Sequence, residues 1–145
     1  MTDFDSSQWA ESEFSEEYRK HANDYLPDRF KLIEIVKSFF RHFIDEVDAP
    51  RVLDLGCGDG LVVYELLKSD DRIRATLVDG FSEMLESAKR RLADFDTVQF
   101  VQATFQDLLE DDRLQSNFDF IFSSFAIHHL EMKEKKALYG YIYHH

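Results

Sequence analysis

The sequence predicts an α/β fold, in which the strands of one parallel sheet alternate with helices. Two observations support this prediction. Beyond residue 50 the apolar residues stop recurring at helical spacing and form short runs, and each run precedes a segment with a helical pattern. The first run also leads directly into glycines at every second position, as is typical of a strand that ends at a ligand-binding loop.

Two helices are expected before the sheet. The first follows Ser15, which can cap a helix, and ends at Pro27. The second follows Asp28 and ends before Pro50. Its apolar stripe comprises Ile33, Val36, Phe40, Phe43 and Val47, and Phe39 is assigned to the core as well.

Four strands and four helices are expected after these two helices. The strands are placed at residues 51–55, 73–78, 98–103 and 118–123. Helical patterns follow them at 60–68, from Ser82 to Leu92, at 106–115 and at 131–143. Because strands alternate with helices, we expect parallel pairing, right-handed crossovers and helices on both faces of the sheet.

Length and composition limit the organisation of the chain. Its 145 residues, 44% of them apolar, fit one domain at 15–145 preceded by an acidic leader at 1–14. The single cysteine excludes an internal disulfide and favours a reducing, cytoplasmic setting. No apolar run reaches the roughly 18 residues of a membrane span. The net charge of −12 disfavours nucleic acid as a partner.

The glycine loop and a later carboxylate predict a ligand site. Gly56, Gly58 and Gly60 follow the strand at 51–55 directly. Asp79 ends the second strand, nineteen residues after Gly60. In a doubly wound sheet that carboxylate lies beside the loop, at the carboxyl edge where ligands bind, and it can accept hydrogen bonds from a ribose diol.

Two cofactor classes use this layout, and the spacing favours one of them. A dinucleotide fingerprint requires a third glycine where this chain has Leu61. Asp59 places a negative charge where a pyrophosphate would bind, and Asp54 adds another at the strand end. The loop therefore suits a ligand that carries a cationic amino acid group, with a nicotinamide-dinucleotide oxidoreductase as the less favoured alternative.

At this point the sequence resembles the class I S-adenosylmethionine-dependent methyltransferases. The resemblance covers about residues 50 to 140, in blocks at 53–60, 77–85, 101–108 and 118–130. It implies a Rossmann-like sheet with the strand order 3-2-1-4-5-7-6. Only the first four strands are found, so the resemblance implies a truncated domain without the C-terminal strands of the family fold. The strand at 118–123 would then be an exposed apolar edge, through which the chain is expected to form a homo-oligomer.

The resemblance also implies which residues bind S-adenosylmethionine and, after the reaction, S-adenosylhomocysteine. The residues implied to contact the methionine and ribose parts of the cofactor are Asp54, Gly56, Cys57, Gly58, Asp79 and Ser123. The adenine side falls to Gly80, Phe81, Met84, Thr104 and Phe105, with Tyr18 closing the pocket, and Tyr25 and Arg29 as alternatives. The family often has aspartate at the position of Thr104, so the contact with the adenine amino group departs from its pattern.

The implied function is methyl transfer by in-line displacement to a small-molecule acceptor. His128 and His129 are candidate general bases, since an imidazole titrates near neutral pH, and the alternative is a structural role at the start of the last helix. No metal site is expected, and Cys57 has no evident activating base. The alternative functions are a non-catalytic S-adenosylmethionine-binding module and an inactive fragment.

Overall fold

In the computed structural model of the chain, residues 17, 20–21, 28–111, 113–114 and 116–145 are described. Their centre is a parallel sheet with the strand order β3-β2-β1-β4, which confirms the predicted fold class and order. The strands are β1 (Arg51–Leu55), β2 (Arg74–Asp79), β3 (Val98–Gln102) and β4 (Phe120–Phe122).

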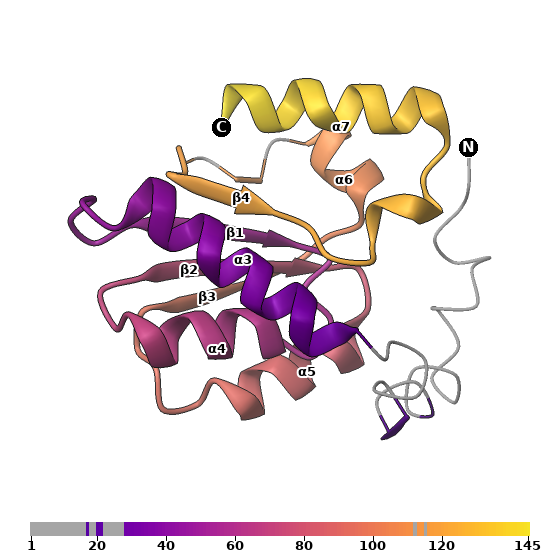
Figure 1. Ribbon diagram of the computed structural model, residues 1–145. Coiled ribbons are helices and arrows are strands. Elements are labelled where there is room, and N and C mark those ends of the chain that lie inside the picture. The colour runs from indigo at the N-terminus through magenta and orange to yellow at the C-terminus, as the bar shows by residue number, and fades with distance from the viewer. Residues whose placement is uncertain (1–16, 18–19, 22–27, 112, 115) are drawn as a thin grey trace.

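Helices cover both faces of this sheet (Figure 1). One face carries α3 (Arg29–Ile44), α4 (Leu61–Ser69) and α5 (Ser82–Arg91). The other carries α6 (Phe105–Glu110) and α7 (Met132–His144), and the short 3-10 helix η3 (Ile127–His129) precedes α7. In the described part of the chain, no helix is both long and apolar enough to cross a membrane.

The core lies in two layers because β1 alternates its side chains between the faces. Val52 packs in the cluster formed with α3, α4 and α5, whereas Leu53 and Leu55 pack in the cluster formed with α6 and α7. All three side chains are fully buried. A central strand buried on both faces explains why this segment reads as a continuous apolar run.

The register of the strands determines where the functional loops lie. Leu55 of β1 pairs with Val78 of β2, and Asp79, one residue later, pairs with Gln102 of β3. Asp54 pairs with Phe122 of β4. Since all four strands run parallel, the loops that follow them meet at one edge of the sheet.

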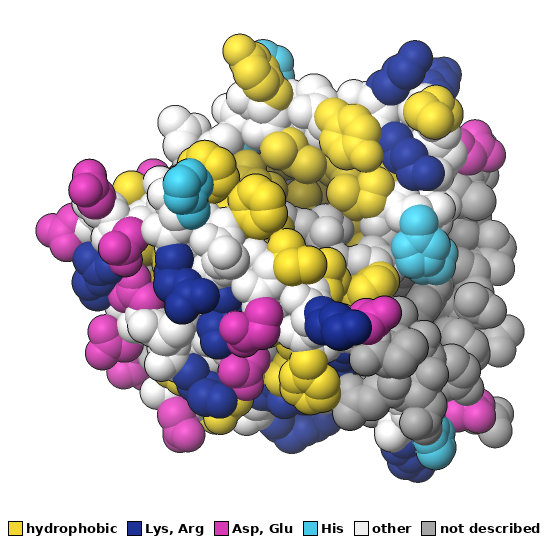
Figure 2. Space-filling model, viewed as in Figure 1, with side chains coloured by type: hydrophobic (Ala, Val, Ile, Leu, Met, Phe, Trp, Pro, Cys, Tyr) yellow, Lys and Arg dark blue, Asp and Glu magenta, His cyan; other side chains and the backbone are white. Residues whose placement is uncertain are grey.

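Helix α3 confirms the second predicted helix but corrects its core. Of the three phenylalanines assigned to the core, only Phe40 is buried, where its ring meets Phe120 edge-on at 5.6 Å between centroids. Phe39 and Phe43 are 54% and 63% exposed. The reason is that α3 packs beside β4, the last strand of the described sheet, so only its sheet-facing side is covered. Figure 2, in the same view as Figure 1, shows hydrophobic side chains gathered on the side of the molecule that carries α3.

Two predictions at the chain start are not decided by this architecture. The first predicted helix and the acidic leader fall almost wholly outside the described residues, as do Tyr18 and Tyr25.

The predicted strand at 118–123 is shorter than expected, because β4 spans only Phe120–Phe122.

Candidate functional site

The glycine loop after β1 is a turn that other residues adopt only with strain. Gly56, Gly58 and Gly60 have φ angles of 74°, 55° and 75°, in the left-handed region. The N–H groups of Gly56 and Cys57 both donate to the carbonyl of Val78, at 2.8 and 2.9 Å. The end of β2 therefore anchors the beginning of the loop.

The glycines of the loop differ in what surrounds them. A side chain at Gly56 would collide with the methyl group of Ala126, which follows β4, whereas a Cβ at Gly58 would meet no atom within 4 Å. At Gly60 a Cβ would lie 3.1 Å from Ala88. Gly56 thus allows the loop after β4 to pack closely, Gly60 allows α4 to begin against α5, and Gly58 leaves an open surface.

Asp79 ties the glycine loop to the loop after β2. Its carboxylate oxygens accept one N–H each, from Gly58 and from Phe81, both at 2.9 Å. Each oxygen retains a further lone pair for a ligand hydroxyl. Burial raises the pKa of Asp79, and the two backbone hydrogen bonds act in the opposite direction.

Asp54 is a buried carboxylate without a compensating group. Its side chain is fully buried, and neither oxygen has a hydrogen-bond partner among the described residues. Burial raises the pKa of Asp54 well above its usual range, and the charges of Asp79 and Asp59 raise it further. Such a group costs folding free energy, and an incoming cationic group would compensate it.

Cys57 lies between two of the glycines but lacks the character of a nucleophile. Its side chain is buried, and burial raises the pKa of the thiol well above its usual value. The carboxylates of Asp54, Asp79 and Asp59 act in the same direction. The thiol therefore stays protonated at neutral pH and serves as a small residue in the loop.

Asp59 makes contacts that the sequence did not reveal. Its carboxylate accepts hydrogen bonds from Arg29 of α3 and Arg91 of α5, each at 2.8 Å. With two guanidiniums on it, Asp59 repels an anion less than the sequence argument assumed, so the case against a pyrophosphate depends on Asp54 and Asp79.

The residues predicted on the adenine side surround the loops after β2 and β3. Phe81 is the residue before α5 and is half-buried, whereas Met84 is only 4% exposed and belongs to the interior. The Thr104 hydroxyl accepts the N–H of Asp107 at 3.1 Å, and Asp107 accepts the N–H of Thr104 in return. Thr104 therefore begins α6 in a capping box, in which its hydroxyl and its backbone N–H both bind Asp107.

Ser123 and Phe105 link the loops from neighbouring strands. The Ser123 hydroxyl donates to the carbonyl of Leu55 at 2.6 Å, which joins the end of β4 to the end of β1. The Phe105 ring lies 3.5 Å from the position of a Cβ on Gly56. The structure thus brings the described residues of the predicted cofactor set to one edge of the sheet, with Met84 beneath it.

The match to known proteins decides between the two cofactor classes. Residues 52–145 match a family model described as a methyltransferase domain. The chain belongs to this family. The family match covers the glycine loop, Asp79 and everything that follows them in the chain.

Individual relatives support the same assignment. The malonyl-[acyl-carrier protein] O-methyltransferase of Halalkalibacterium halodurans is 33% identical over 78 residues, which are 53% of this chain and 29% of the relative. Among solved structures, the plantazolicin methyltransferase BamL, in complex with a substrate analogue and SAH, superposes with a TM-score of 0.72 at 22% identity, over 94% of this chain and 49% of its own. The amino pentose methyltransferase CalS10 of Micromonospora echinaspora, bound to SAM, superposes with a TM-score of 0.63 at 22% identity. The match covers 79% of this chain and 45% of CalS10. The chain spans less than half the length of each of these proteins.

The two candidate bases of this methyltransferase domain lie in the segment after β4. His128 and His129 are exposed on η3, with ring centroids 3.9 Å apart. The N–H of His129 donates to the carbonyl of Ala126, the residue packed against Gly56, at 3.3 Å. Partial desolvation of the ring, with the charge of His128, lowers the pKa of His129. No group of three or more metal-ligating side chains occurs within the described ranges.

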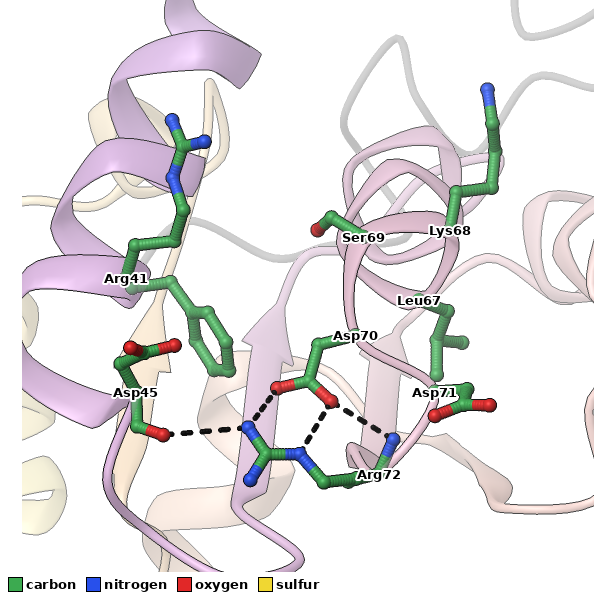
Figure 3. A pocket seen from close by; sticks show the side chains of 9 residues that line it. Arg41, Asp45, Leu67, Lys68, Ser69, Asp70, Asp71 and Arg72 are labelled. Carbon is green, nitrogen blue, oxygen red and sulfur yellow. Dashed lines mark hydrogen bonds and ion pairs between the residues drawn. The ribbon is translucent and has the colours of Figure 1, made fainter.

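A cavity of about 400 Å³ lies elsewhere, at the opposite end of the methyltransferase sheet (Figure 3). It is lined where α3 and α4 end and just before β2 begins, so it borders the amino ends of the strands. Arg72, which lines the cavity, donates to the carboxylate of Asp70 at 2.7 and 2.9 Å and to the carbonyl of Asp45 at 3.4 Å. Because ligands of such sheets bind at the carboxyl ends, we assign no cofactor role to it.

Proposed function

We propose that this domain binds S-adenosylmethionine at the carboxyl edge of its sheet and transfers the methyl group to a small-molecule acceptor. The observation that carries the proposal is Asp54, a fully buried carboxylate with no hydrogen-bond partner among the described residues. Burial and the neighbouring carboxylates disfavour the ionised form of Asp54, and a cation bound beside it would favour that form. The ammonium group of the methionine moiety supplies one, whereas a dinucleotide would bring two more negative charges.

The other side chains at this edge support the same ligand. We assign the ribose hydroxyls to Asp79, whose oxygens have lone pairs left, and the close approach of the ligand to Gly58, which has open space above it. We assign the remaining cofactor contacts to the loops that hold Gly56, Cys57, Gly80, Phe81, Thr104, Phe105 and Ser123, with Met84 as support beneath the adenine and Tyr18 as a closing residue.

Little proton chemistry is required of the protein in such a reaction. When bound, S-adenosylmethionine supplies a methyl group that is already activated by its sulfonium. The residues of this chain then contribute mainly alignment of the reactants, which accounts for much of the rate in such displacements. We propose that His129 accepts the proton that the methyl acceptor loses, since the lowered pKa of His129 keeps its imidazole neutral at neutral pH. His128, beside it, is the alternative.

The cofactor is tested by calorimetry with S-adenosylhomocysteine and with NAD on the full chain. We expect binding of the former and none of the latter. Replacing Asp79 with alanine should weaken S-adenosylhomocysteine binding about 10- to 100-fold, because charged hydrogen bonds to two hydroxyls are lost. The exposed Asp71→Ala is the matched control and should bind as the wild type. Binding of NAD alone would refute the proposal, and an unchanged affinity of Asp79→Ala would refute its ribose role.

A non-catalytic binding module is the second candidate, favoured by one observation. The buried Asp54 and the glycine loop account for binding of the cofactor, whereas the two candidate bases, His128 and His129, are exposed. Incubation with methyl-labelled S-adenosylmethionine and a panel of hydroxyl, amine and carboxyl acceptors distinguishes the two functions. Transfer to any acceptor supports the enzyme, whereas tight S-adenosylhomocysteine binding without transfer supports the binding module.

We also propose that two copies of the chain associate through β4. This strand pairs with β1 on one side and with no strand of the described sheet on the other. On α3, the exposed rings of Phe39 and Phe43 stack on each other, with 6.0 Å between their centroids. Antiparallel pairing of two β4 strands would extend the sheet, and we propose that the two exposed rings on α3 add apolar surface to the same contact. Light scattering should find a dimer that Phe39→Glu/Phe43→Glu converts to a monomer. A wild-type monomer at all concentrations would contradict this.

The domain limits and location complete the proposal. We propose a domain at 15–145, since α3 precedes the matched residues 52–145 yet packs in their core through Phe40 and Ile44. Residues 1–14 remain an acidic leader in this proposal. A free, buried Cys57 supports the proposed cytoplasmic location, where thiols stay reduced.

A further inference from the structure

Asp59, in the middle of the glycine loop, is held from two sides. Arg29 donates to one carboxylate oxygen at 2.8 Å, and Arg91 donates to the other at 2.8 Å. The Nε–H of Arg91 also donates to the backbone carbonyl of Asp59 at 3.0 Å. The side chain of Asp59 is only 11% exposed and that of Arg29 only 17%, so water screens this pair less than a surface ion pair.

The two arginines belong to separate helices on the same face of the sheet. Arg29 is the first residue of α3 and Arg91 is the last residue of α5. They are 30 and 32 residues from Asp59 in the chain. Asp59 therefore joins α3, α5 and the glycine loop at one point.

The loop needs such a constraint because its own charges oppose it. The charges of Asp59 and Asp79 both raise the pKa of Asp54, which means that both carboxylates lie close enough to Asp54 to oppose its ionisation. In addition, the residue before α4 is Gly60, which has no side chain to cap the helix. Asp59 accepts the N–H of Leu61 at 3.3 Å instead.

We propose that Arg29 and Arg91 are positioning residues, which clamp Asp59 and so hold the glycine loop in its ligand-binding shape before the ligand arrives. A loop ordered in advance loses less conformational freedom on binding, so the clamp increases affinity without touching the ligand. The inference rests on the proposed function only for the identity of that ligand.

The first measurement is hydrogen exchange of the loop amides in the chain without ligand. Arg29→Met and Arg91→Met each remove one side of the clamp, and both should accelerate exchange across residues 56–61 about tenfold. Lys31→Met on α3 and Arg90→Met on α5 are the matched controls, since both positions are exposed. They should leave the exchange of this segment unchanged.

The second measurement is the affinity for S-adenosylhomocysteine of the same variants. Arg29→Met and Arg91→Met should each bind about tenfold more weakly, and the controls should bind as the wild type. Lysine variants add a geometric test. Arg91 uses two of its N–H groups on Asp59 and Arg29 uses one, so Arg91→Lys should lose more affinity than Arg29→Lys.

The outcomes separate the clamp from the proposed function. Unchanged exchange across residues 56–61 in both methionine variants would overturn the clamp, whatever the ligand. Faster exchange with unaltered affinity would also overturn it. If the wild type binds no S-adenosylhomocysteine, the proposed function fails, while hydrogen exchange of the lysine and methionine variants still decides whether the arginines hold the loop.

Discussion

The loops that follow β1 and β4 meet at the same edge of the sheet but are built differently. The loop after β1 places glycine at each of its three left-handed positions. The loop after β4 places Phe125 at φ 58°, in a region that bulky residues avoid, and leaves 42% of its surface exposed. The first loop is encoded by its residue types, whereas the second is held in its conformation by its surroundings.

The difference separates two kinds of information in the chain. The glycines, Asp54 and Asp79 have local sequence signatures, and they make up the cofactor half of the proposed site. The conformation of Phe125 and the contact of Ala126 with Gly56 depend on the folded structure. Strained backbone of this kind costs about 1–3 kcal/mol and is often retained for function.

The largest expected effect comes from forcing the two loops apart. Gly56→Ala should lower the free energy of unfolding by about 3 kcal/mol or more, from a left-handed alanine and a collision with Ala126. Gly58→Ala is the matched control, because it has a positive φ but open space, and should cost only about 1–2 kcal/mol. Urea denaturation measures both. Adding Ala126→Gly to Gly56→Ala should recover the part of the lost free energy of unfolding that comes from the collision. No recovery would mean that the loops do not touch as described.

A smaller effect, dependent on pH, is expected at Asp54. Its pKa is raised in the folded state, so the folded chain binds this proton more tightly than the unfolded chain. The tighter proton binding stabilises the folded chain. The stabilisation is fully present below the unfolded pKa of about 3.9 and is lost as the pH rises through the folded pKa. Asp54→Asn lacks this loss, so its stability relative to the wild type should increase with pH.

Denaturant titrations from pH 4 to pH 8 test this slope, and parallel titration curves for the two proteins would contradict it. The same substitution should remove the pH dependence of S-adenosylhomocysteine binding. In the wild type a cationic ligand favours ionised Asp54, so affinity should fall as the pH is lowered. Calorimetry in buffers of different ionisation enthalpy should detect the proton released on binding.

The smallest expected effect isolates the strain at Phe125. Phe125→Gly and Phe125→Ala both remove the ring, but only glycine adopts a φ of 58° without strain. The glycine variant should therefore be about 1 kcal/mol more stable than the alanine variant, which reverses the usual order of these residues. Thermal unfolding of the pair measures the difference, and the usual order would show that the loop relaxes.

The parts of the molecule that were predictable from sequence share a local cause. β1 was predicted at its observed bounds because its apolar run leads directly into the glycines. The strand order was predicted from the family resemblance, which itself depends on apolar runs, glycines and Asp79 at short spacing. The contacts of Arg91 with Asp59 were not predictable, since no spacing links a helix end to a loop 32 residues away. The exposure of Phe39 and Phe43 was missed because helical spacing does not reveal how far the sheet extends beneath α3.

The hydrogen bond from Ser123 to the carbonyl of Leu55 has a consequence for recombination between relatives. It fastens the end of β4 to β1 through a backbone atom, so the bond does not depend on the side chain at position 55. A crossover immediately after Ser123 would keep the glycine loop, Asp79 and the aligned strand ends from one parent. The segment from residue 124 onward would come from the other parent. Ser123 is therefore a natural boundary for building chimeras, as long as the incoming segment keeps alanine or glycine at position 126, where it packs against Gly56.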